Sequence, residues 1–227
     1  MIRGKCPPFR NIVLIALLTL MSNMAAMPRT SADESRAHLA RSGMHQASDA
    51  RQRVLTWQQL IKSNRDARPY EKLLRVNNFF NRLEFVNDKD LWGMEDYWAT
   101  PIQMLSSNGG DCEDFSIAKY FTLISMGIAE EQLRLTYVRA LDLDQAHMVL
   151  SYYPPAGAEP LILDNLNTSI LPASRRTDLR PVYSFNGDGL WLARRKGKDE
   201  RVGGAARLSR WKEVVARISH EHMPPIR

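Results

Sequence analysis

The stretch Gly109-Gly110-Asp111-Cys112-Glu113-Asp114-Phe115 places a cysteine directly after a glycine turn, where a helical pattern begins. Apolar residues recur beyond it at three- and four-residue steps, which predicts a helix from about Cys112 to Met126, ended by Gly127. Free backbone N–H groups at a helix N-terminus favour the thiolate over the thiol. The position therefore predicts a nucleophilic cysteine, and a small packed residue is the alternative.

The N-terminus has the features of a secretion signal. Basic residues precede a short uncharged apolar run from Ile12 to Met21, and small residues follow at Ala25-Ala26. The run is too short to span a membrane comfortably. We therefore expect residues 1–26 to be removed and the mature protein to be exported and soluble; an uncleaved anchor is the alternative. Removal takes Cys6 away and leaves Cys112 unpaired, which is unusual because exported cysteines normally form disulfides.

The length and charge of the remaining chain indicate one domain without a nucleic-acid partner. The formal net charge is +6, and loss of the three basic residues of the signal leaves +3, which is too mild to indicate nucleic-acid binding. A basic stretch from Arg194 to Arg217 is interpreted as a solvated terminal segment. We expect a flexible lead-in over residues 27–52, a folded domain over residues 53–195 and a basic C-terminal tail over residues 196–227.

Helical patterns fill the first half of this domain, and strand patterns fill the second half. Apolar residues recur with helical spacing from Val54 to Ile61 and again after Pro69. Short apolar or alternating runs that predict strands follow the cysteine helix and begin at Leu133, His147, Leu161, Tyr183 and Gly189. A helical half followed by antiparallel strands indicates an α+β fold.

A cysteine nucleophile needs a base and a third group that orients this base. Of the five histidines, two lie in the lead-in and two in the tail, so His147 is the only one inside the predicted domain. Asp164 ends the next strand pattern, and hairpin pairing would place it beside His147. Asp142 and Asp144 are alternatives, because the register of a hairpin is not fixed by sequence. A packed histidine and a strand-end cap are the non-catalytic interpretations.

The acidic residues Asp111, Glu113 and Asp114 flank the cysteine. Negative charge beside a thiolate raises the pKa of the thiol, so these acids oppose nucleophilic chemistry unless something neutralises them. They are either first-turn acids that favour the helix dipole or ligands of a hard cation, for which calcium is the expectation. The run Asp88–Gly93 superficially resembles an EF-hand loop, but a tryptophan and an alanine stand where oxygen ligands are required, which excludes that motif.

Five motifs along the chain support a resemblance to a known family. They are Tyr97-Trp98-Ala99-Thr100-Pro101, Gly109-Gly110-Asp111-Cys112-Glu113-Asp114, Ala146-His147-Met148-Val149-Leu150, Leu163-Asp164-Asn165 and Tyr183-Ser184-Phe185-Asn186-Gly187-Asp188-Gly189. From about Val54 to Leu192, the chain resembles the bacterial transglutaminase-like cysteine proteinases. The resemblance implies a papain-like/transglutaminase-like core in which the cysteine helix packs on an antiparallel sheet. It also implies Cys112 as nucleophile, His147 as general base and acid, and Asp164 as the orienting partner.

The resemblance further implies a calcium (Ca2+) dependence carried by Asp111 and Glu113, to which the acidic turn adds Asp114. Within the family, the chain is similar to periplasmic enzymes that cut the N-terminal region of large surface adhesins near a pair of alanines and so release cells from a biofilm. An inner-membrane receptor that senses cytoplasmic cyclic diguanylate sequesters these enzymes. The similarity therefore implies a periplasmic location, an adhesin substrate and the periplasmic domain of such a receptor as an inhibitory partner.

Three other functions are compatible with the same residues. A transglutaminase-like acyl transferase would deliver the acyl group to an amine and yield cross-links instead of fragments. A non-catalytic, calcium-dependent binding module would be unaffected by Cys112→Ala. A structural exported domain with a packed Cys112 would not react with iodoacetamide in its native state.

Overall fold

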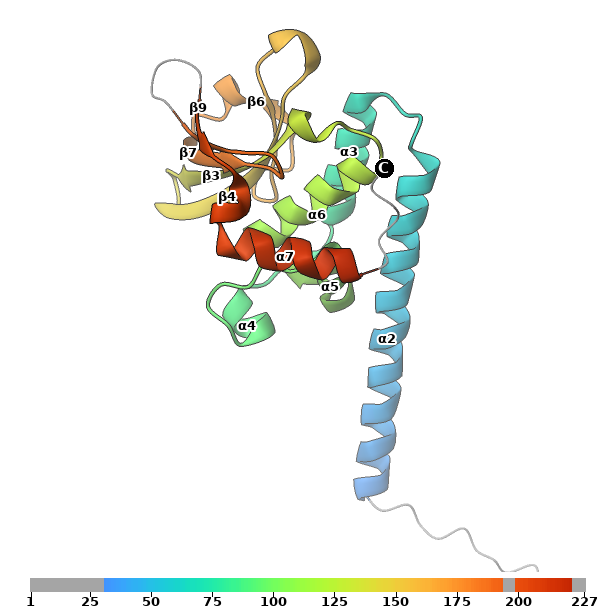
Figure 1. Ribbon diagram of the computed structural model, residues 1–227. Coiled ribbons are helices and arrows are strands. Elements are labelled where there is room, and N and C mark those ends of the chain that lie inside the picture. Colours follow the sequence, from blue (N-terminus) through green and yellow to red (C-terminus); the bar gives the residue numbers. More distant parts are fainter. Residues whose placement is uncertain (1–30, 194–198, 222–227) are drawn as a thin grey trace, which may run out of the picture. The chain divides into compact units, whose positions relative to one another are not determined.

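The computed structural model describes residues 31–193 and 199–221, so the expected signal over residues 1–26 lies outside the described residues. The chain divides after His45 into two units. In the first unit the described residues belong to the beginning of helix α2 (Ser31–Ser63). The second unit starts at Gln46 and holds the rest of α2 and all the elements that follow (Figure 1). None of the helices in the described ranges combines the length and apolar character that a membrane crossing requires.

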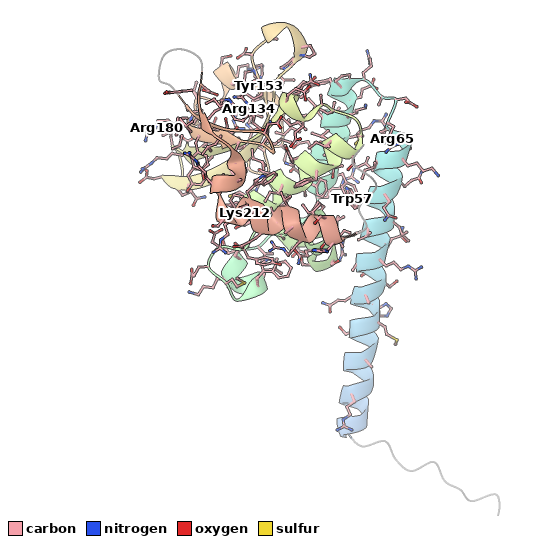
Figure 2. The ribbon with its side chains drawn as sticks, viewed as in Figure 1. Trp57, Arg65, Arg134, Tyr153, Arg180 and Lys212 are labelled. Carbon is pink, nitrogen blue, oxygen red and sulfur yellow. The ribbon has the colours of Figure 1, made fainter. Side chains whose placement is uncertain are left out.

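Helix α6 (Cys112–Ser125) is the central helix of the second unit, with other helices around it (Figure 1). These are α3 (Pro69–Phe80), α4 (Asp88–Trp92), α5 (Pro101–Ser107) and α7 (Ser209–His220). Eleven of the fourteen residues of α6 are buried, as expected for a helix that packs on all sides. The fully buried Trp57 of α2 donates its indole N–H to Thr122 Oγ1 of α6 at 2.8 Å (Figure 2).

A seven-stranded antiparallel sheet packs against α6. Its strands are β3 (Leu133–Ala140), β4 (Gln145–Tyr152), β5 (Leu161–Leu163), β6 (Leu171–Pro172), β7 (Leu179–Phe185), β8 (Leu190–Leu192) and β9 (Glu200–Gly203). They lie in the order β6-β5-β4-β3-β7-β8-β9. Two short strands, β1 (Glu84–Phe85) and β2 (Gly109–Gly110), pair in parallel ahead of α6. The α+β fold class is confirmed.

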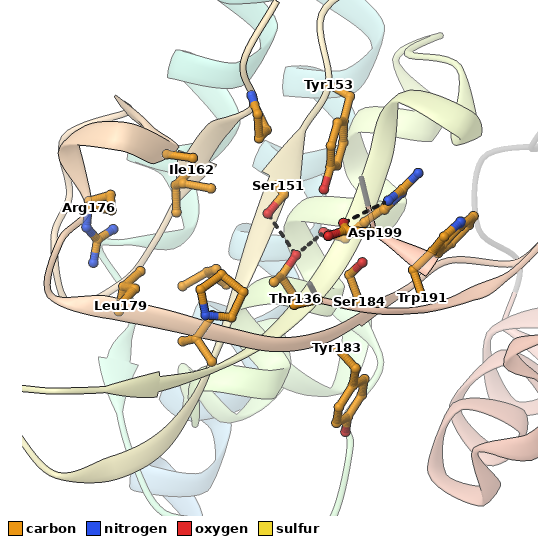
Figure 3. Close-up of a pocket in the computed structure, with 17 residues that line it drawn as sticks. Thr136, Ser151, Tyr153, Ile162, Arg176, Leu179, Tyr183, Ser184, Trp191 and Asp199 are labelled. Atoms are coloured by element: carbon orange, nitrogen blue, oxygen red, sulfur yellow. Dashed lines mark hydrogen bonds and ion pairs between the residues drawn. The ribbon is translucent and has the colours of Figure 1, made fainter. Parts of the chain in front are cut away.

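The two faces of the sheet have different surroundings because side chains alternate along each strand. Met148 and Leu150 of β4 face α6 and belong to the main core. On the other face, Val149 packs with Val138 and Ile162 in a smaller apolar cluster. A cavity of about 490 Å³ lies over that second face, and hydroxyl, aromatic and arginine side chains complete its wall (Figure 3).

The C-terminal segment differs from the basic tail expected over residues 196–227. In its described part, β9 extends the sheet and α7 packs into the main core through Trp211, Val214 and Ile218. The expectation of a solvated segment is therefore wrong for these residues. The three apolar side chains recur at three- and four-residue steps and form one face of a helix whose other face carries the charges.

The segment expected as a lead-in over residues 27–52 also differs, because α2 is helical from Ser31 onward. Its described side chains between Arg36 and Asp49 are exposed, which matches the polar composition of this stretch. The predicted helices after Pro69 and from Cys112, and the five predicted strands, are present. Gly127 has a φ of +86° after α6, as its predicted left-handed conformation requires.

Candidate active site

The N-terminus of α6 is built by a capping box that fixes the backbone at Cys112. The Asp111 carboxylate accepts hydrogen bonds from the backbone N–H groups of Glu113 and Asp114 at 3.2 and 3.4 Å. The Asp114 carboxylate in turn accepts the N–H of Asp111 at 3.4 Å. A side chain at Gly110 would collide with the Asp114 carboxylate, so this glycine permits the close approach of strand β2 to the helix. The sequence predicts a glycine turn before the cysteine helix, but in the structure Gly109 and Gly110 form the short extended strand β2.

The thiol of Cys112 is half-buried and lies among acidic groups. Its Sγ donates to Glu113 Oε2 at 2.8 Å, and the backbone N–H of Met148 contacts the sulfur. Burial, the charge of Glu113 and the charge of Asp111 raise the pKa of the Cys112 thiol well above its usual range, against a smaller opposing effect from Met148. The protein without a cation therefore holds this cysteine as a thiol.

His147 and Asp164 meet at the edge of the β4–β5 pair. His147 Nε2 and Asp164 Oδ1 are 2.8 Å apart, and both side chains are almost completely buried. The antiparallel pairing of Leu150 with Leu163 produces this proximity, as the predicted hairpin requires. The alternatives do not reach the histidine: Asp144 forms an ion pair with Arg139, and Asp142 is exposed.

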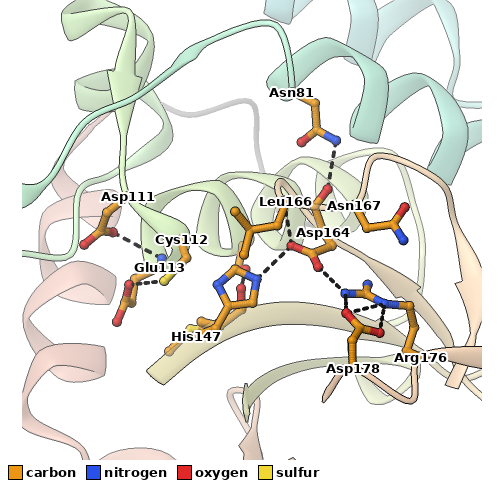
Figure 4. Close-up of polar contacts among 12 residues, drawn as sticks. Asn81, Asp111, Cys112, Glu113, His147, Asp164, Leu166, Asn167, Arg176 and Asp178 are labelled. Carbon is orange, nitrogen blue, oxygen red and sulfur yellow. Dashed lines mark hydrogen bonds and ion pairs between the residues drawn. The ribbon is translucent and has the colours of Figure 1, made fainter. Parts of the chain in front are cut away.

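Helix α6 packs on β4, which places the Cys112 sulfur against the backbone of Met148, the residue after His147. Ser116 Oγ of α6 donates to the carbonyl of Met148 at 3.0 Å, which anchors the helix beside the histidine. Figure 4 shows the imidazole ring between Cys112 and Asp164, with its second nitrogen on the cysteine side. The structure thus gathers the thiol, the imidazole and the carboxylate in one region, where α6 meets strand β4.

The Asp164 carboxylate is fully hydrogen-bonded. In addition to His147, Oδ1 accepts the N–H of Leu166 at 3.0 Å, and Oδ2 accepts Nη2 of Arg176 at 2.7 Å (Figure 4). The carbonyl of Asp164 accepts Nδ2 of Asn81 at 2.8 Å. Burial alone would raise the pKa of Asp164, but the bonds from His147, Leu166 and Arg176 outweigh burial and lower it to about 2. Asp164 is therefore a permanent carboxylate at neutral pH.

Three carboxylates beside the cysteine form a candidate metal centre. Ligand atoms of Asp88, Asp111 and Asp114 lie within 4.8 Å of one another. Asp88 Oδ2 accepts the N–H of Tyr97 at 2.6 Å, whereas its Oδ1 is buried and has no hydrogen-bond partner in the described structure. Asp114 Oδ1 accepts the N–H of Ala99 at 2.6 Å. Oxygen donors of this kind are the ligands that calcium prefers.

The electrostatics of this cluster favour a bound cation. Burial and the charges of Glu113, Asp114 and Asp88 raise the pKa of Asp111 to about 10. Burial also raises the pKa of Asp114, to about 8, and the charge of Asp88 adds to that increase. Carboxylates that repel each other in a buried site are stabilised as anions by a divalent cation. The residues present therefore fit calcium.

The cluster differs in one member from the predicted ligand set of Asp111, Glu113 and Asp114. Asp88 joins Asp111 and Asp114, while the Glu113 carboxylate binds the thiol. A role for Glu113 as a ligand stays a prediction. In the sequence, Asp88 belongs to a stretch that only superficially resembles an EF-hand loop. The one local signal for its role is the acidic character of this stretch around Trp92.

The fold and the site together define a class of protein. An α+β domain that presents a cysteine at the N-terminus of its central helix, beside a hydrogen-bonded histidine and aspartate on an antiparallel sheet, has the architecture of papain-like and transglutaminase-like cysteine peptidases. The family model described as bacterial transglutaminase-like cysteine proteinase, BTLCP, matches residues 44–184, and the chain belongs to this family.

Solved structures of LapG from Legionella pneumophila are similar to this chain. The EGTA-treated form has 45% sequence identity and a TM-score of 0.68, and the match covers 75% of this chain and 90% of that chain. The calcium-bound form has the same identity and a TM-score of 0.66, with 75% and 91% covered. No protein with a curated description matches the chain. The chain is therefore a cysteine peptidase of the BTLCP family, similar to LapG.

Proposed function

We propose that this protein is a calcium-dependent periplasmic cysteine endopeptidase with Cys112, His147 and Asp164 as its catalytic triad. Its substrate is the N-terminal region of a large surface adhesin, cut near a pair of alanines, and the cut promotes biofilm dispersal. The observation that carries the proposal is the 2.8 Å contact of His147 with Asp164 beside the half-buried Cys112. Similarity to LapG and the implied family substrate supply the adhesin.

The residues divide the chemistry of peptide hydrolysis among them. The sulfur of Cys112 attacks the peptide carbonyl carbon, while the imidazole of His147 takes the thiol proton and gives it to the departing amine. A thioester remains. His147 then takes a proton from water, the resulting hydroxide attacks the thioester, and the sulfur leaves and is reprotonated. Asp164 orients the ring through Nε2 in both steps, which leaves the other nitrogen for the thiol and the water.

The negative oxygen that develops on the carbonyl needs backbone N–H donors. The amide of Cys112 at the first turn of α6 is the natural candidate, because the capping box of Asp111 and Asp114 fixes its orientation. A cation bound by Asp88, Asp111 and Asp114 would supply positive charge that lowers the pKa of the nearby thiol.

A cleavage assay tests the proposal. The purified protein is mixed with the N-terminal region of a co-encoded giant adhesin, and the products are examined for fragments. We expect two fragments with calcium, and none with EGTA or with Cys112→Ala. Cleavage by Cys112→Ala would contradict a cysteine mechanism and favour another activity in the preparation. Covalent cross-links to an added amine, without fragments, would favour the acyl transferase.

The expected inhibitory partner belongs to the same proposal. We expect the periplasmic domain of an inner-membrane cyclic-diguanylate receptor to bind the protein and to suppress cleavage in proportion to the bound fraction. Binding by Cys112→Ala with unchanged affinity would separate this interaction from catalysis. Full cleavage in the presence of a saturating receptor domain would contradict the partnership.

A further inference from the structure

We propose that Arg176 is a positioning residue for the triad, whose guanidinium fixes the orientation of the Asp164 carboxylate and thereby that of His147. The inference rests on the proposed function, because it requires Cys112, His147 and Asp164 to act together. Arg176 lies twelve residues after Asp164, and neither the sequence motifs nor the family comparison assigns it a role.

Arg176 holds the one oxygen of Asp164 that the histidine does not use. It follows the 3₁₀ turn Ala173–Arg175 and is only 4% exposed. Its Nη2 donates to Asp164 Oδ2 at 2.7 Å, while Oδ1 accepts from His147 and Leu166. Because both oxygens are bound from different directions, the carboxylate cannot rotate without breaking a charge-assisted hydrogen bond.

The guanidinium is itself held in place by a second carboxylate. Nε and Nη2 of Arg176 donate to Asp178 at 2.9 and 2.7 Å, and the backbone N–H of Arg176 donates to Ala173 at 3.0 Å. Asp178 in turn is anchored through its carbonyl, which accepts the N–H of Leu141 at 2.8 Å. The planar fork of arginine therefore bridges Asp164 to the start of β7, which a single lysine donor would do less rigidly.

Arg176 also provides the charge that a buried carboxylate needs. Asp164 is 1% exposed, and an unpaired carboxylate at such a place is strongly destabilised. The buried Lys119 of α6 acts on Asp164 through space, but burial lowers the pKa of Lys119 to about 7, so its charge is not secured at neutral pH. Arginine stays protonated at every working pH. Arg176 thus adds a permanent positive charge to the bonds from His147 and Leu166 that keep Asp164 an anion.

Steady-state kinetics on the adhesin fragment test this role. We expect Arg176→Gln to lower kcat on the order of 10- to 100-fold and to change KM less than about twofold, because the loss concerns the geometry of the base and not substrate contacts. Arg176→Lys should recover part of kcat, since it keeps the charge. Arg175→Gln, at an exposed neighbouring arginine, is the matched control and should stay within about twofold of wild type.

A double-mutant cycle with Asp164→Asn tests whether Arg176 acts through Asp164. In that background we expect Arg176→Gln to lower kcat less than about threefold further. An equal loss in both backgrounds would overturn the inference, because it would show a general structural effect. If Arg176→Gln fails to fold, Arg176→Lys decides: a folded variant with wild-type kcat would overturn it.

The rate of Cys112 alkylation by iodoacetamide measures the reactivity of the thiol without a substrate. It therefore separates the positioning role of Arg176 from the proposed peptidase function. We expect Arg176→Gln and Asp164→Asn to change this rate by the same factor. Wild-type kinetics for Arg176→Gln together with a slow Asp164→Asn would overturn the role of Arg176 and leave the proposed function standing. Full cleavage by both Cys112→Ala and Asp164→Asn would instead overturn the proposed function.

Discussion

At the scale of single residues, the thiol of Cys112 and the acids around it are chemically opposed. Burial, Glu113 and Asp111 raise the pKa of the thiol, and a nucleophile requires the thiolate. One of these carboxylates, that of Asp111, converges with Asp88 and Asp114 into a group that fits a divalent cation. We therefore expect a cation bound by this group to offset the negative charge that keeps the sulfur in its thiol form.

The first prediction concerns calcium and the reactivity of the thiol. We expect calcium to accelerate the alkylation of Cys112 by iodoacetamide at least about tenfold at neutral pH, because a cation lowers the pKa of the thiol by a unit or more. Mass spectrometry of the labelled protein measures the rate. Asp88→Asn should abolish the acceleration, and Asp90→Asn, at an exposed residue of the same helix, should preserve it. Equal rates with calcium and with EGTA in the wild type would disprove the link.

The second prediction separates the two roles open to Glu113. Its carboxylate contacts the sulfur at 2.8 Å, so Glu113→Gln should remove a negative charge and a thiol acceptor. We expect this variant to react faster than wild type with iodoacetamide in EGTA, by a factor of about three to ten. The second role in question is that of a calcium ligand. Isothermal titration of Glu113→Gln with calcium measures it. A slower reaction in EGTA would show that Glu113 supports the thiolate by another route.

The residues of the site divide into those that sequence could reveal and those that it could not. Cys112 and His147 stood out through position and elimination, and strand order predicted the contact with Asp164. Asp88 and Arg176 reach the site across the fold, from a short helix and from the turn before β7. Such contacts depend on tertiary packing, which the local sequence around each residue does not determine.

At the scale of elements, α7 completes the environment of α6. Trp211 stacks on Phe121 with ring centroids 5.5 Å apart and meets Tyr120 and Phe185 edge-on. The sequence predicted α6 and the main strands because their apolar periods are strong. The sequence did not reveal α7. Charged residues dominate the composition of this helix, and only three apolar residues mark its buried face.

The third prediction measures the contribution of α7 to stability. We expect Trp211→Ala to lower the free energy of unfolding by about 3–5 kcal/mol, since it removes a buried aromatic ring from a packed cluster. Urea denaturation followed by circular dichroism measures this value. The neighbouring Arg210→Ala removes only exposed ion pairs and should cost less than about 1 kcal/mol. Comparable losses in the two variants would refute the packing argument.

At the scale of the whole molecule, the acidic cluster links separate parts of the chain. Asp88 begins α4, Asp111 caps α6 and Asp114 lies in its first turn. Their carboxylates are forced together by the fold and are separated in the unfolded chain. The stability of the second unit therefore depends on whether these groups are protonated, ionised or bound to a cation.

The fourth prediction is a pH dependence of stability in EGTA. The pKa values of Asp111 and Asp114 are raised in the folded state from 3.8 to about 10 and about 8. The folded state thus binds more protons than the unfolded state between these values, and stability falls as the pH rises through this window. We expect the Tm in EGTA to decrease from about pH 5 to about pH 8, and saturating calcium to remove most of the decrease. A Tm in EGTA that rises over this interval would contradict the repulsion among the three acids.

The packing of α7 over α6 also makes the end of the described chain part of the scaffold of the site. Residues 209–220 follow Cys112, His147 and Asp164 in the sequence, yet they cover the aromatic side of the helix that carries the cysteine. A chain truncated before Ser209 would keep all three of these residues but would leave Tyr120 and Phe121 without the ring of Trp211. The presence of the three side chains is therefore not sufficient for an intact site.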